Sequence, residues 1–252
     1  MKKRLLYRGG STRACRYAEE LLADAGVAFT DHPSPDVTHL LLDIPSFDNS
    51  GNLRGGQQVD AILSMLPEDI GIIGGKLNQP LLDGYATVDL LTKEDYLSAN
   101  AAITAHCALQ VAAPYLQTTF ADTKTLIVGW GRIGKCLAEL LKGLHCPVTV
   151  AARREKDRCM LRALGYRAAD MTEIPRILED TRLLFNTVPQ PVIPKETLSS
   201  AGHCIQIELA SQPGLSGPHV IPALGLPGVY APESSGRLIA QTLLRHWKEE
   251  SF

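Results

Sequence analysis

Three glycines at fixed spacing follow a short apolar segment in the middle of the chain. Residues 125–128 are suited to a buried strand, and the residues after the glycines repeat apolar side chains at helical spacing. In such a unit the first glycine permits a tight turn, the second lets the backbone approach a pyrophosphate, and the third lets helix and strand pack closely. The alternative is a turn whose glycines serve packing alone. The pattern predicts a dinucleotide-binding turn formed by Gly129, Gly131, Arg132, Ile133 and Gly134.

Two arginines stand where the second strand of this unit is expected to end. Arg153 lies 19 residues after Gly134, and Arg154 follows it. Dinucleotide folds that prefer NAD usually place an acidic residue about 20 residues after the turn, where it binds the ribose 2′-hydroxyl. Guanidinium groups at this position suit a 2′-phosphate instead. The sequence therefore favours NADP, with NAD as the second choice; the alternative is that both arginines cap a surface turn next to Glu155 and Asp157.

Polar and proline-containing loops follow the later predicted strands. Ligands of open parallel sheets bind outside the carboxyl ends of the strands, so we expect these loops to shape the cofactor pocket. The first loop gives four cofactor-binding residues, Asn186, Thr187, Val188 and Pro189. Residues 210–214 and 226–232 are expected to form two more loops, although Pro and Gly also simply end strands. Candidate substrate-binding residues are Arg13, Ser46, Lys76, Asn100, Ser211 and Gln212.

No catalytic residue can be assigned from the sequence. The seven histidines lack metal-ligand spacing, no Ser-His-Asp or Cys-His order is present, and we expect no metal. The six cysteines never form a CxxC pair and most lie in apolar or helical stretches, which predicts buried thiols.

Alternation of strands and helices positions these residues in an α/β fold with two domains. Short apolar segments predict strands at 4–8, 39–43, 71–74, 125–128, 147–151, 183–187 and 203–209. We expect an N-terminal α/β domain over residues 1–92, with a glycine turn at Gly9 and Gly10 that presents the N-terminus of its first helix, together with Arg13, to an anion. A long linker helix is expected over 93–121, and a Rossmann NADP-binding domain with a parallel sheet over 122–231. A C-terminal helix over 232–252 is expected to pack back toward the N-terminal domain.

Charge and hydropathy exclude several classes of partner. The chain has 25 Lys and Arg against 27 Asp and Glu, a formal net charge of −2, without long runs of one sign. This balance gives neither a nucleic-acid footprint nor a patch for anionic membranes. No apolar run reaches roughly the 18 residues of a membrane span, so we expect a cytoplasmic protein that binds a small molecule.

These motifs resemble those of the dipicolinate synthase A family, the dehydrogenase-like subunits of that enzyme, over most of the chain. The resemblance rests on the glycine turn at 128–134 with Ala-Arg at the second strand, on Asn-Thr-Val-Pro at 186–189, and on Leu-Ala-Ser-Gln-Pro-Gly at 209–214. Its strongest motif is Leu-Pro-Gly-Val-Tyr-Ala-Pro-Glu-Ser-Ser-Gly at 226–236. The opening turn with Arg13 is similar as well.

The resemblance implies oxidation of a dihydrodipicolinate-like cyclic dicarboxylate, derived from the lysine pathway, to dipicolinate during sporulation, with NADP+ taking the hydride. It also implies a flavoprotein-like partner, dipicolinate synthase B; self-association into a homo-oligomer is a further expectation. The chain departs from the family pattern at Gln212, where the family has Arg, at Leu215, where it has Gly, and at Asn100, where it has an acidic residue. Two alternatives follow: an NAD(P)-dependent dehydrogenase of a hydroxy or keto acid, and a non-catalytic, cofactor-binding regulatory subunit.

Overall fold

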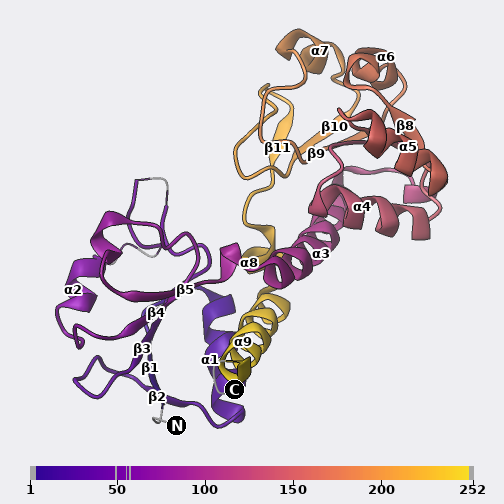
Figure 1. Ribbon diagram of the computed structural model, residues 1–252. Coiled ribbons are helices and arrows are strands. Elements are labelled where there is room, and N and C mark those ends of the chain that lie inside the picture. The colour runs from indigo at the N-terminus through magenta and orange to yellow at the C-terminus, as the bar shows by residue number, and fades with distance from the viewer. Residues whose placement is uncertain (1–3, 49, 55, 57, 250–252) are drawn as a thin grey trace. The chain divides into compact units, whose positions relative to one another are not determined.

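The computed structural model describes the chain except residues 1–3, 49, 55, 57 and 250–252, and the chain forms two compact units (Figure 1). Unit 1 comprises residues 1–100 and 227–252, and unit 2 comprises residues 101–226. The divisions fall inside α3 (Glu94–Ala112) and α8 (Leu226–Tyr230). None of the described helices has the length and apolar character needed to cross a membrane.

Unit 1 is built on a five-stranded parallel sheet in the order β2-β1-β3-β4-β5. The central strands are short and apolar, and Leu40 and Ile72 are completely buried. The strands are β1 (Leu5–Arg8), β2 (Ala28–Thr30), β3 (His39–Leu41), β4 (Gly71–Gly74) and β5 (Ala86–Asp89), with helices α1 (Arg13–Asp24) and α2 (Val59–Leu63).

The last helix, α9 (Pro232–Glu249), packs along α1 within unit 1 (Figure 1). The two backbones approach closely at Gly236, where an added Cβ atom would lie 2.7 Å from the carbonyl oxygen of Ala14 and 2.9 Å from the amide nitrogen of Ala18. Small residues at this crossing therefore let the first and last helices of the chain close one unit.

Unit 2 holds a six-stranded parallel sheet in the order β11-β10-β9-β6-β7-β8. The order reverses between β9 and β6, as in the doubly wound sheets of dinucleotide-binding folds. The strands are β6 (Thr125–Val128), β7 (Val148–Ala151), β8 (Arg167–Ala169), β9 (Leu183–Asn186), β10 (Ile205–Glu208) and β11 (Val220–Pro222). The helices are α4 (Arg132–Gly143), α5 (Glu155–Ala163), α6 (Ile174–Leu178) and α7 (Lys195–Ser200).

The predicted α/β fold with parallel sheets and a Rossmann-type unit is confirmed, and three expectations about local structure are corrected. Residues 226–230, predicted as a loop, form α8, because Pro227 in its first turn is compatible with a helix start. The long helix α3 ends at Ala112, since Pro114 cannot continue it, and short 3-10 turns follow. Cys159 is exposed rather than buried, whereas Cys15, Cys107, Cys146 and Cys204 are buried thiols and Cys136 is intermediate.

Candidate cofactor-binding site

A pocket of about 350 Å³ lies at the carboxyl ends of the central strands of unit 2. Its wall comes from the segments that follow β6, β7, β8 and β9, which surround the point where the strand order reverses. Open parallel sheets bind ligands at this switch point, and small-molecule sites typically measure about 300–1,000 Å³. The lining residues are Gly129, Trp130, Gly131, Ala152, Arg153, Arg154, Asp157, Met171, Val188, Pro189, Gln190 and Val192.

The three glycines of the turn have three separate structural roles. Gly129 has φ = 105°, and an added Cβ there would overlap Thr187 Oγ1. An added Cβ at Gly134 would overlap the carbonyl oxygen of Gly129, so this glycine lets α4 start close to β6. At Gly131, the N-cap of α4, an added Cβ would meet no atom within 4 Å. Because the open space beside Gly131 lies at a helix N-terminus without acidic residues in its first turn, it suits a pyrophosphate.

The two arginines after β7 differ in their surroundings. Arg154 is paired with Asp157, through Nε to Oδ2 at 2.7 Å and Nη2 to Oδ1 at 3.3 Å. The hydrogen bond from Arg154 lowers the pKa of Asp157 below its ordinary value, so this carboxylate stays charged. The guanidinium of Arg153 has no partner among the described residues and lines the pocket. Within the described part of the chain, an unpaired guanidinium and a paired one therefore lie side by side where the sequence predicts two 2′-phosphate ligands.

Arg158 holds the backbone that presents these arginines, a role that the sequence analysis missed. Its Nη1 donates to the carbonyl oxygens of Ala152 at 2.7 Å and Arg153 at 2.8 Å. The same guanidinium forms an ion pair with Asp170 at 2.6 Å. Its spacing from Arg153 gives no motif, so only the fold of the turn after β7 reveals this role.

The loop after β9 is held by buried hydrogen bonds. Asn186 is completely buried, and its amide contacts the backbone of Val188 and the carboxylate of Glu208 rather than the pocket. Thr187 Oγ1 donates to the carbonyl oxygen of Val128 at 2.9 Å. Val188 and Pro189 line the pocket. Asn186 thus supports the predicted cofactor loop from behind, while Val188 and Pro189 form its surface.

In unit 1, the predicted anion site at the first glycine turn is filled from within the chain. The carboxylate of Asp43, itself only 3% exposed, accepts from the amide nitrogens of Ser11 at 2.9 Å and Thr12 at 3.0 Å. Because Asp43 already occupies the positive end of α1, no second anion is expected there. Ser46 is completely buried, and its hydroxyl donates to the carbonyl oxygen of Asp43 at 2.7 Å and accepts from the amide of Gly75 at 3.1 Å. We therefore correct the expectation that Ser46 is available to a substrate.

The other candidate substrate residues lie at the surface of their own units. Arg13 begins α1 and is exposed, and Lys76, which follows β4 with φ = 58°, is exposed as well. Asn100 lies in α3 and is partly buried. In unit 2, Ser211 and Gln212 follow β10 in an exposed loop. Their assignment to a substrate site stays a prediction.

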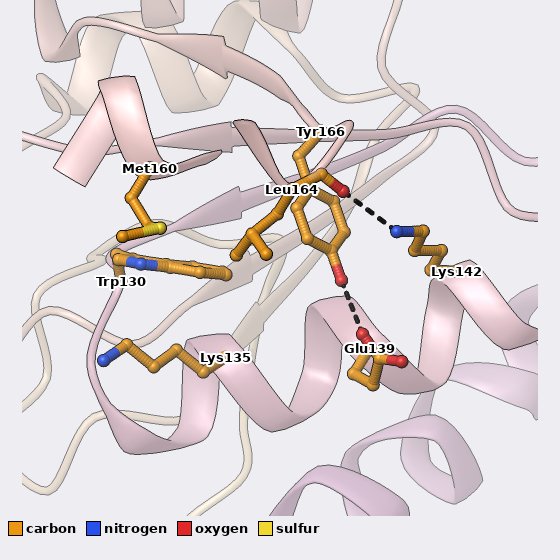
Figure 2. A pocket seen from close by; sticks show the side chains of 7 residues that line it. All are labelled: Trp130, Lys135, Glu139, Lys142, Met160, Leu164 and Tyr166. Atoms are coloured by element: carbon orange, nitrogen blue, oxygen red, sulfur yellow. Dashed lines mark hydrogen bonds between the residues drawn. The ribbon is translucent and has the colours of Figure 1, made fainter. Parts of the chain in front are cut away.

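A second hollow of about 330 Å³ lies beside α4 and α5 of unit 2 (Figure 2). Trp130, the residue between the first two glycines of the turn, lines this hollow as well as the cofactor pocket. Tyr166 OH donates to Glu139 Oε2 at 2.9 Å, and burial together with this hydrogen bond raises the pKa of Tyr166 to about 12. The Nζ atom of Lys142 donates to the carbonyl oxygen of Leu164 at 2.9 Å. No residue predicted to bind a cofactor or substrate lines this hollow.

Within the described part of the chain, neither cysteine thiols nor clustered metal ligands line the cofactor pocket. No group of three or more His, Cys, Asp or Glu side chains among these residues is placed to hold a metal ion. Burial raises the pKa of Cys204 to about 12 and also raises the pKa of Cys15. Neither buried thiol is therefore an ionised nucleophile near neutral pH.

Comparison with known proteins agrees with this architecture. Residues 98–198 match the family described as D-isomer specific 2-hydroxyacid dehydrogenase, NAD binding domain. The chain is also 26% identical over 165 residues to dipicolinate synthase A of Bacillus subtilis (strain 168). That alignment covers 62% of this chain and 56% of the relative, so it spans little more than half of the relative's length. The resemblance to the dipicolinate synthase A family, which the sequence motifs predict, is confirmed.

Solved structures extend the similarity to nearly the whole chain. The structure of dipicolinate synthase A from Bacillus halodurans has a TM-score of 0.81 at 19% identity, covering 96% of this chain and 97% of that one. The corresponding protein from Bacillus subtilis has a TM-score of 0.78 at 18% identity, covering 99% and 97%. A transhydrogenase from Sinorhizobium meliloti has a TM-score of 0.69 at 13% identity, covering 98% and 94%. At these identities the likeness shows a shared fold.

Proposed function

Starting from a dehydrogenase-like chain with a nicotinamide dinucleotide-binding domain, related to dipicolinate synthase A, we propose that the protein is an NADP-dependent oxidoreductase. The observation that supports this best is the pairing of an open glycine turn with an unpartnered guanidinium, among the described residues, in one pocket. The space beside Gly131 fits a pyrophosphate, and Arg153 fits the 2′-phosphate of the adenosine ribose. Gly129, Gly131, Arg132, Ile133 and Gly134 hold the pyrophosphate end, and Val188 and Pro189 form a neighbouring part of the wall.

The proposed substrate is a cyclic dicarboxylate of the dihydrodipicolinate type, and the product is dipicolinate. When bound, oxidised NADP would supply the acceptor for a hydride from a ring carbon of this substrate, whose ring would also release a proton to solvent on becoming aromatic. The chain's own contribution is to bind and orient the two reactants. Ser211 and Gln212, in the exposed loop after β10, are the proposed substrate ligands of unit 2. Because the name of the relative marks it as one component of its enzyme, we propose a second, flavoprotein-like protein as partner.

Calorimetric titration with NADP+ and NAD+ tests the cofactor assignment. We expect NADP+ to bind more tightly than NAD+, and Arg153→Ala to remove that difference by weakening NADP+ about ten-fold, a change typical of losing one charge-assisted contact. A matched control is Arg176→Ala, because Arg176 is an exposed arginine of the same unit that lies near the amino ends of the strands. Equal losses for both dinucleotides, or no binding of either, would contradict the assignment.

Repeating the titration with dipicolinate present tests the substrate class. A dipicolinate signal that depends on bound NADP+ supports the proposal. A second candidate, a dehydrogenase of a hydroxy or keto acid, is favoured by the family match over residues 98–198. Reduction of NADP+ by a 2-hydroxy acid, without any response to dipicolinate, identifies that candidate. Tight cofactor binding without turnover, even with the partner protein present, identifies a regulatory protein.

A further inference from the structure

Glu208 carries a carboxylate that is buried at the carboxyl end of β10, with 1% of the residue exposed. It accepts from the amide nitrogens of Ala210 at 2.8 Å, Gly214 at 2.8 Å and Leu215 at 2.6 Å. No cation among the described residues forms an ion pair with it. A buried carboxylate is costly even when it is hydrogen-bonded, and an apolar residue avoids that cost. Stability alone therefore does not explain a buried carboxylate at residue 208.

Glu208 also determines which way the side-chain amide of Asn186 faces. Asn186 Nδ2 lies 3.0 Å from Glu208 Oε1 and 2.9 Å from Oε2. Both oxygens of Glu208 already accept from backbone amides, so the NH₂ group of Asn186, and not its oxygen, faces them. In this orientation Asn186 Nδ2 also donates to the carbonyl oxygen of Val188 at 2.9 Å, and Oδ1 accepts from the amide of Val188 at 3.2 Å. Both polar groups of the Val188 backbone are thus held by one oriented amide.

Val188 stands between the glycine turn and the loop after β10. An added Cβ at Gly129 would lie 2.9 Å from Val188 Cγ2, so the two segments are in contact. On the other side, an added Cβ at Gly214 would overlap the carbonyl oxygens of Val188 and Gln190. The wall of the pocket formed by Val188, Pro189 and Gln190 therefore has little freedom as long as Glu208 keeps Asn186 and the loop after β10 in place.

We propose that Glu208 is a positioning residue for the cofactor: it fixes the amide of Asn186 and, through it, the Val188 segment that forms one wall of the dinucleotide pocket. The proposal rests on the dinucleotide site described under the proposed function. Glu208 does not line the pocket, but its hydrogen bonds pre-organise the pocket before the cofactor binds.

Glu208→Gln tests this role at nearly constant volume. The new NH₂ group faces donors in either orientation. In place of Oε1 it meets the amide of Ala210 and Nδ2 of Asn186. In place of Oε2 it meets the amides of Gly214 and Leu215 and again Nδ2 of Asn186. Turning Asn186 over to accept from it presents oxygen to the carbonyl of Val188 and NH₂ to its amide. Either arrangement displaces the wall, and we expect the Kd for NADP+ to rise about ten-fold by calorimetry, since an unsatisfied buried donor costs enough for such a change.

Gln206→Leu is the matched control. Gln206 lies two residues earlier in β10, hence on the same face of the sheet, and is equally buried. Its Nε2 donates to the carbonyl oxygens of Leu198 at 2.8 Å and Ala201 at 3.2 Å, away from the pocket. We expect this variant to lower Tm and leave the Kd unchanged. Equal increases of Kd in both variants would mean that general destabilisation, rather than positioning, weakens binding.

Asn186→Ala supplies the second test, which is usable even if Glu208→Gln does not fold. It leaves the carboxylate with its three backbone donors but releases Val188, so the Kd should again rise about ten-fold. The double variant should be no worse than either single one, because both act through the same contact. An unchanged Kd in Asn186→Ala, or additive losses, would overturn the proposal. If the unaltered chain binds neither NADP+ nor NAD+, the cofactor site itself is wrong.

Discussion

Two glycines of the turn, Gly131 and Gly134, lie three residues apart, and the same substitution at each should have a different effect. Gly134→Ala places a methyl group against the carbonyl oxygen of Gly129, and 3.2 Å from its carbonyl carbon. Gly131→Ala places one in open space, with φ = −82° and ψ = −167°, which any residue adopts. The first change should therefore affect folding, and the second should affect the dinucleotide.

The cost of Gly134→Ala follows from the atoms that the methyl group meets. Both belong to the backbone of the turn, so they cannot rotate away, and overpacking of this kind costs roughly 1–3 kcal/mol. Replacing a helical glycine by alanine returns up to about 1 kcal/mol. Taking the middle of the first range, we expect a net loss of about 1 kcal/mol, which lowers Tm by roughly 3 °C in a unit of this size. Gly131→Ala changes only the residue type at the N-cap, which costs less than about 1 kcal/mol.

Binding should show the reverse order. Gly131→Ala fills the space proposed for the pyrophosphate, and we expect the Kd for NADP+ to rise more than about ten-fold with little change in Tm. The assays are differential scanning calorimetry and isothermal titration on both variants. An unaltered Tm in Gly134→Ala would refute the packing argument. An unaltered Kd in Gly131→Ala would refute the placement of the pyrophosphate.

Three further predictions concern packing, cofactor choice and pH. Gly236→Ala should lower Tm, because the added methyl group forces α1 and α9 apart. Gly143→Ala places a methyl group in open space and should leave Tm unchanged or raise it slightly. Differential scanning calorimetry of both variants measures this difference. Asp157→Asn removes a carboxylate from the pocket wall and frees its partner, the guanidinium of Arg154. NADP+ should therefore bind about five-fold more tightly, while the affinity for NAD+ increases little. A comparable increase for NAD+ would contradict a 2′-phosphate site. Hydrogen bonds, that from Arg162 foremost, lower the pKa of Glu155 from its ordinary 4.5 to about 2. The hydrogen bonds of ionised Glu155 therefore stabilise the folded state fully above about pH 4.5, and this stabilisation disappears as the pH falls toward 2. The Tm difference between the unaltered chain and Glu155→Gln should shrink over that interval. A constant Tm difference would show that these hydrogen bonds are not the cause.

The sequence predicts the central strands well and the edge strands poorly. β1, β3, β4, β6, β7, β9 and β10 all coincide with apolar segments that are recognisable in the sequence. The four strands without such a segment, β2, β5, β8 and β11, are the outer strands of the two sheets. Outer strands are less covered on their faces, so their sequences need no continuous apolar run, and their pairing is set by the neighbouring strand.

What the sequence determines by itself about this protein is the local chemistry that depends on spacing along the chain. The glycine turn, the basic residues after the second strand and the family resemblance are all local patterns, because turns and helix starts are built from residues close in sequence. The tertiary structure decides how residues far apart in sequence use their polar groups. It shows that Asp43 fills the predicted anion site of unit 1, that Asp157 pairs with Arg154 but not with Arg153, and that Glu208 meets Asn186 across two strands. Such pairings depend on strand order and on which groups are buried together, and one sequence carries no direct signal for either.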